Sequence, residues 1–100
     1  MTADELKELW LAFELEEFPA ACEGLTVKGM LYEQVDAVAA ACIATFLRTG
    51  ALDDECLALF DGALDRLAAI EAAVDESDRP YFTRFLEIAA AVRAAARPAP

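Results

Sequence analysis

The 100-residue chain is acidic and apolar: 19 Asp and Glu stand against 8 Lys and Arg, the net charge is −11, and 58% of its residues are hydrophobic. This charge repels nucleic acid and anionic membranes and attracts basic proteins, which argues against direct nucleic-acid or membrane binding. The chain has no histidine. That absence excludes Ser-His-Asp and Cys-His nucleophiles, His-ligated zinc and the Glu-x-x-His di-iron site of helical bundles.

The first predicted helix spans residues 3–18. Thr2 and Glu5 form a capping box at its start, and Pro19 stops it. At helical spacing, one apolar stripe that should face the core comprises Leu6, Leu9, Trp10 and Phe13. A second stripe on the other side comprises Leu11, Leu15 and Phe18.

A helix with two apolar stripes packs one against its own core and needs a second element to cover the other, so the second stripe predicts a partner interface. The predicted site residues are Leu11, Leu15 and Phe18, with Glu8, Glu14, Glu16 and Glu17 on the rim. The alternative is that the neighbouring loop covers this stripe. The high hydrophobic share, above the usual value of about 45–50%, also favours some surface being covered by a partner.

The second predicted helix spans residues 27–49, with Thr26 as a possible N-cap, or starts a turn later after Gly29. Gly50 is its expected C-cap. Residues 37–47 contain no charge, which predicts a segment buried on all sides. The alternative is that its alanines favour helix and tolerate solvent. No run alternates with period 2, so no strand is expected.

The third and fourth predicted helices span residues 54–74 and 79–96. Asp53 is the expected N-cap of the third, and Asp78 with Pro80 in the first turn opens the fourth. Short loops make consecutive helices antiparallel neighbours. The predicted fold is therefore all-α, an antiparallel up-down four-helix bundle forming one domain over residues 1–97, with a frayed tail at 98–100.

The sequence contains few candidates for catalytic, metal-binding or cofactor-binding residues. The carboxylate clusters at residues 14–17, 53–55 and 75–78 lie at predicted helix ends or on exposed faces, which favours capping or solvation over acid–base work or a metal site. No phosphate-binding glycine loop is present. We therefore expect no cofactor, no metal and no catalytic residue. Three cysteines without C-x-x-C spacing, and no signal peptide at the N-terminus, predict a cytoplasmic protein.

The function predicted from these features is a non-catalytic acidic helical protein–protein interaction module, of an adaptor, inhibitor or immunity type. It should self-associate as a homodimer and bind a basic protein partner. One alternative is a DNA-mimic inhibitor of a nucleic-acid-binding protein, which would need acids spaced along one face. The other is a small-molecule carrier or enzyme that uses the bundle interior.

Overall fold

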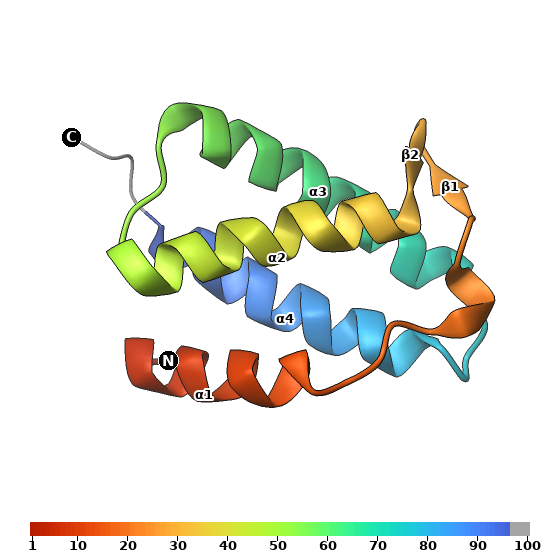
Figure 1. Cartoon of the computed structure of the whole chain (residues 1–100), viewed down its shortest axis with the longest axis horizontal. Helices are drawn as coiled ribbons and strands as arrows, with labels where there is room; N and C mark the ends of the chain where they lie inside the picture. The colour runs from red at the N-terminus through yellow and green to blue at the C-terminus, as the bar shows by residue number, and fades with distance from the viewer. Residues whose placement is uncertain (97–100) are drawn as a thin grey trace.

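The computed structural model describes residues 1–96. Four helices alternate in direction along a body of 39 × 27 × 17 Å (Figure 1), which confirms the predicted up-down helical bundle. A 3₁₀ turn, Ala20–Cys22, and a two-stranded hairpin lie between the first two helices. In chain order the helices and strands are α1 Ala3–Glu14, β1 Thr26–Val27, β2 Met30–Leu31, α2 Tyr32–Thr49, α3 Asp54–Ala73 and α4 Arg79–Ala95. The predicted tail at 98–100, and residue 97 of the predicted domain, lie outside the described residues.

The core is centred on α2, α3 and α4, which pack closely on one another, while α1 packs mainly against α4. Its largest fully buried side chains include Phe60 of α3 and Phe82 and Phe85 of α4. Leu6, Trp10 and Phe13 are the buried residues of α1. Over residues 1–96 the buried residues are hydrophobic throughout, so burial of apolar surface is the main stabilising contribution.

Most predicted helix ends are confirmed. The Thr2 hydroxyl accepts from the Glu5 amide at 3.1 Å, and the Asp53 carboxylate accepts from the Cys56 amide at 2.7 Å. Gly50 ends α2 in the left-handed conformation at φ 79°, where glycine carries no Cβ penalty. Asp78 precedes α4 but makes no side-chain cap. Its carboxylate instead accepts a long contact, 4.0 Å, from the buried Cys22 thiol.

Helix α1 ends at Glu14, four residues before the predicted end. The amides of Leu15 and Glu16 donate to carbonyls three residues back, which tightens the last turn and closes the helix. Residue 18 precedes Pro19 and is therefore disfavoured in the helical region. Phe18 instead packs edge-on against Tyr81 and Phe82 of α4, with ring centroids 5.9 and 6.1 Å away.

The expectation that the chain holds no strand was wrong. Thr26 pairs with Leu31 and Val27 with Met30 across a two-residue turn. Lys28 and Gly29, at φ 47° and 79°, both have the positive φ of a type I′ turn. Tertiary contacts hold this turn on α3, because Lys28 forms an ion pair with Asp65 and its carbonyl accepts from Arg66. Helix α2 consequently starts at Tyr32, nearer the alternative start after Gly29.

The prediction that the uncharged residues 37–47 are buried on all sides was also wrong. Ala39, Ile43 and Phe46 face the core, but Ala37, Ala41 and Ala44 are exposed. The reason is that α1 packs mainly on α4, which leaves the outer side of α2 uncovered. The alternative is therefore correct: these alanines favour helix and tolerate solvent. None of the helices in the described residues is long and apolar enough to cross a membrane.

Candidate interaction surface

The outer side of α1 carries the most exposed apolar side chains of the predicted interface. Leu11 is 54% exposed and Leu15 is 87% exposed. They are four residues apart at the C-terminal end of α1, a spacing that places both on one face. Phe18 does not join them, because it turns inward onto α4. The structure therefore brings together two of the three predicted apolar site residues.

The four predicted rim carboxylates divide into two kinds. Glu8, Glu14 and Glu17 are exposed. Glu16 is half-buried, and its two carboxylate oxygens accept from the Arg84 guanidinium of α4, with one N–H···O distance of 2.8 Å. Bidentate pairs of this kind fix geometry as well as charge. Glu16 thus ties the end of α1 to α4, and three negative charges remain around Leu11 and Leu15.

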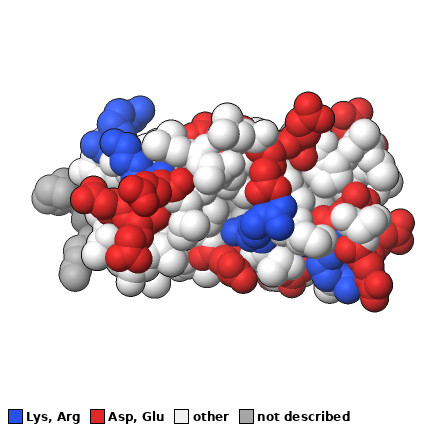
Figure 2. All heavy atoms as spheres, turned by 90° about the horizontal axis from the view of Figure 1, so that it is seen from below, with Lys and Arg blue, Asp and Glu red and all other residues white. Residues whose placement is uncertain are grey.

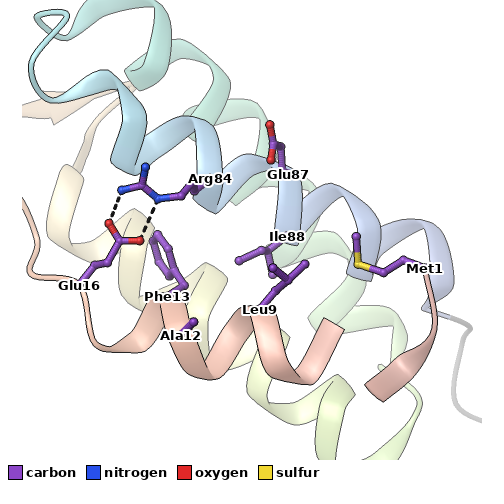
Figure 3. Close-up of a pocket in the computed structure, with 8 residues that line it drawn as sticks. All are labelled: Met1, Leu9, Ala12, Phe13, Glu16, Arg84, Glu87 and Ile88. Atoms are coloured by element: carbon purple, nitrogen blue, oxygen red, sulfur yellow. Dashed lines mark hydrogen bonds and ion pairs between the residues drawn. The ribbon is translucent and has the colours of Figure 1, made fainter. Parts of the chain in front are cut away.

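A groove of about 220 Å³ runs between α1 and α4, beside this face. Leu9 of α1 and Ile88 of α4 point toward each other in it, and the Glu16–Arg84 pair lies at one end (Figure 3). Its lining residues are Met1, Leu9, Ala12, Phe13, Glu16, Arg84, Glu87 and Ile88. Met1 and Leu9 are 72% and 46% exposed, so the groove presents apolar surface to solvent.

The sequence pattern did not reveal this groove. Leu9 falls on the inner stripe of α1 at helical spacing, and full burial was the natural expectation. Its exposure depends on where α4 lies, which the period of one helix cannot show. Ala12 is exposed between Leu9 and Leu15 at i+3 spacing. The groove and the two outer leucines therefore form one apolar surface, which we call the α1 surface: the exposed Met1, Leu9, Leu11, Ala12 and Leu15, together with Ile88, which is buried but lines the groove.

Acidic groups surround uncharged surface on this side of the molecule. Figure 2 views the protein from the side on which α1 lies, and shows acidic side chains at both ends of the face and near its middle, where they adjoin a basic patch, with uncharged atoms between these groups. Helix α1 itself carries Asp4, Glu5, Glu8 and Glu14 against the single cation Lys7. The potential around the α1 surface is therefore negative, and it favours basic groups.

The thiols are poorly suited to nucleophilic chemistry. Burial raises the pKa of the Cys22 and Cys42 thiols, and a hydrogen bond with Asp53 is the main cause of the raised pKa of Cys56. A raised pKa leaves less of the reactive thiolate at neutral pH. Within residues 1–96, no group of three or more Cys, Asp or Glu residues is placed to hold a metal ion.

One partly buried polar pair could not be predicted from the sequence. The Tyr81 hydroxyl of α4 donates to Asp36 of α2 across 2.5 Å. Burial raises the pKa of Asp36, although this hydrogen bond opposes the rise. Burial also raises the pKa of Tyr81, and the neighbouring carboxylate adds to the effect. The two residues are 45 positions apart in the chain, and no local pattern could have paired them.

Comparison with models of protein families, with curated proteins and with solved structures gave no match. The surface and cavities of this chain are therefore the basis for inferring its function.

Proposed function

We propose that this protein is a non-catalytic interaction module that binds a basic amphipathic helix of a partner protein along the α1 surface. The observation that carries the proposal is the exposure of Leu15, 87%, beside Leu11 and the apolar groove. Contiguous exposed apolar surface with a polar rim is typical of protein-binding sites.

The shape of the α1 surface favours a helix as the bound element. The groove follows two packed helices, and an amphipathic helix binds such grooves through anchors at i, i+3, i+4 and i+7. Leu11 and Leu15 border the groove through Ala12 and would pack against the side of the same ligand helix. Its volume of about 220 Å³ suits one or two apolar anchor side chains.

The charge around the α1 surface favours a basic partner over a second copy. Two copies meeting here would bring Asp4, Glu5, Glu8 and Glu14 of each near those of the other, with only Lys7 in α1 to offset them. Like charges brought together across an interface cost free energy. A helix with Lys or Arg beside its apolar stripe would meet the acidic rim instead. Self-association, which the sequence also predicts, is a separate outcome of the test below.

The test is binding of a fluorescent Leu/Lys amphipathic helical peptide, followed by anisotropy. We expect the wild type to bind it, with affinity falling as salt rises. Leu15→Glu should weaken binding roughly 10- to 100-fold, because it replaces a leucine whose burial is worth about 1.5–3 kcal/mol.

The control is Leu59→Glu, since Leu59 of α3 is 52% exposed and matches Leu11 in exposure. It introduces the same charge away from α1 and should leave binding unchanged. A Leu/Glu peptide of equal hydrophobicity should not bind. Equal binding by the wild type and Leu15→Glu would contradict the proposal. A dimer in light scattering that Leu15→Glu dissociates would show that a second copy occupies the surface.

A further inference from the structure

A second cavity, of about 260 Å³, lies where the C-terminal end of α1 meets α2 and α4. It is separate from the apolar groove, and of its lining residues only Phe13 and Glu16 also line that groove. Asp36 and Ala40 of α2 and Tyr81 of α4 form part of its wall. The Asp36–Tyr81 hydrogen bond is therefore at the edge of a space that a ligand could enter.

The polar groups of this cavity are negative. Three carboxylates line it, those of Glu14, Glu16 and Asp36, and no Lys or Arg does. Arg84 neutralises Glu16 from the α4 side. Asp36 has only the neutral Tyr81 hydroxyl as its hydrogen-bond donor, and within residues 1–96 neither Asp36 nor Glu14 takes part in an ion pair.

The end of α1 adds to this negative potential. The helix ends at Glu14, beside the cavity, and the last carbonyls of a helix carry the negative end of its dipole. Asp36 is partly buried, so its negative charge is less well solvated than that of an exposed carboxylate, and this burial raises its pKa. A cation placed in the cavity would relieve that unfavourable burial.

Aromatic side chains supply the rest of the wall. Trp10, Phe13, Phe18 and Tyr81 line the cavity and form one connected cluster. Trp10 stacks on Phe13 at 5.7 Å, and Tyr81 lies 4.9 Å from Phe13 and 5.9 Å from Phe18. Aromatic rings attract organic cations and accept their alkyl groups, whereas they offer no ligand to a metal ion. The combination of carboxylates and aromatic rings therefore selects an organic cation.

We propose that this cavity binds the ammonium or guanidinium group of an organic cation, with Asp36 and Glu14 as its anionic partners and the aromatic cluster around its alkyl stem. Its volume is below the 300 Å³ or so at which drug-sized ligands fit, and suits a group the size of one side chain.

The ammonium or guanidinium group could belong to either of two kinds of ligand. One is a free small amine or guanidine. The other is a lysine or arginine side chain of the basic partner, and only this second source rests on the proposed function. Both place the same charged group between Asp36 and Glu14.

The experiment is an NMR titration of the full chain with butylguanidinium, and with butylurea as its neutral isostere. We expect butylguanidinium to shift the signals of Ala40, Tyr81 and the Trp10 indole, and butylurea to leave them unchanged. Asp36→Asn retains an oxygen that can accept from Tyr81 and should weaken binding about fivefold or more. Glu14→Gln, at an exposed position that does not threaten folding, should weaken binding in the same direction.

Glu87→Gln is the matched control, because it removes one carboxylate from α4 at the other groove. It should leave the affinity for butylguanidinium unchanged. Equal binding of butylurea, equal loss in Glu87→Gln and Asp36→Asn, or shifts spread over all acidic residues would each overturn the proposal.

The Leu/Lys peptide distinguishes the two sources. If Asp36→Asn weakens both peptide and butylguanidinium, the partner's side chain enters the cavity. If it weakens butylguanidinium alone, the ligand is a free cation. Leu15→Glu should affect the peptide and not butylguanidinium, so that failure of the α1 surface and failure of the cavity give different results.

Discussion

Helices α1 and α3 are both amphipathic, yet they bury their leucines to different extents. In α3, Leu57 and Leu67 are buried, Leu64 is partly buried and Leu59 is exposed. In α1, Leu6 alone is buried, while Leu9, Leu11 and the C-cap Leu15 are exposed. The difference is in the number of neighbours: α3 packs against both α2 and α4, whereas α1, at the opposite edge of the bundle, contacts mainly α4 (Figure 1).

Apolar periodicity therefore indicates how much surface a helix can bury. The number of its neighbours decides how much it does bury. The second apolar stripe of an edge helix is not buried within a single copy of the chain. The exposed leucines of α1 are therefore the candidates for binding a partner. Substitutions in the core and in α1 should therefore differ in their effects on stability and on binding.

The largest effect should come from Phe60→Ala in α3. Phe60 is fully buried, and removing a buried phenylalanine ring costs about 3–5 kcal/mol of unfolding free energy. Leu15→Ala in the α1 surface should change stability by less than about 0.5 kcal/mol, as exposed substitutions usually do. Urea unfolding followed by circular dichroism measures both. A comparable loss in Leu15→Ala would remove the distinction between the two regions.

Trp10→Ala should come next, at about 3 kcal/mol. The Trp10 ring stacks on Phe13 and lies 5.9 Å from Phe85 of α4, so it joins α1 to the rest of the bundle. We expect native-state hydrogen exchange to show faster opening of α1 amides, with α3 amides less affected. Equal loss of protection in both helices would mean that α1 unfolds only with the core.

A smaller effect, confined to pH dependence, should follow from Asp36→Asn. The pKa of Asp36 in the folded protein is raised above its ordinary 3.8, so the folded state holds this proton to higher pH than the unfolded state does. Wild-type stability should therefore fall, relative to Asp36→Asn, as pH rises from about 3.8 through the raised pKa. Thermal unfolding of both proteins across that range measures the difference. A gap that does not change with pH would contradict this account.

The smallest effect should come from Lys28→Asn in the hairpin. Lys28 has φ 47°, a conformation that costs an ordinary L-residue about 1 kcal/mol and that asparagine adopts more readily. Loss of the exposed Lys28–Asp65 ion pair offsets part of this gain. We expect a net stabilisation of a few tenths of a kcal/mol in urea unfolding. Lys28→Ala, which loses the ion pair without relieving the backbone, should be destabilising.

Local sequence signals predicted much of the fold. Thr2, Asp53 and Gly50 mark helix ends through hydrogen bonds or backbone conformations that involve only nearby residues, and each prediction is confirmed. The hairpin was missed because Lys-Gly is a weak I′ signal and its strands are two residues long. Contacts with Asp65 and Arg66, some 37 positions away, hold it in place.

The candidate site was predicted in part. Leu11 and Leu15 share a helix face, so their spacing sufficed to group them. Phe18 was grouped with them only because α1 was expected to continue to residue 18, and Pro19 together with the aromatic contacts on α4 directs it inward. The exposure of Leu9 and the hydrogen bond between Asp36 and Tyr81 were not predicted, since both depend on how separate helices pack.

Caps, periodicity and composition are properties of neighbouring residues. The amino-acid sequence alone therefore sufficed to predict that this protein is helical, where most of its helices begin and end, and that it carries a strong negative charge. Which apolar stripes are covered depends on the packing of the helices against one another and could not be predicted from their periodicity. The packing of the helices leaves Ala37, Ala41 and Ala44 of α2 and Leu9 and Leu11 of α1 exposed, and it forms an acidic, aromatic-lined cavity between three helices. Burial depends on how many neighbours an element has, and that number is set by the packing of the whole chain.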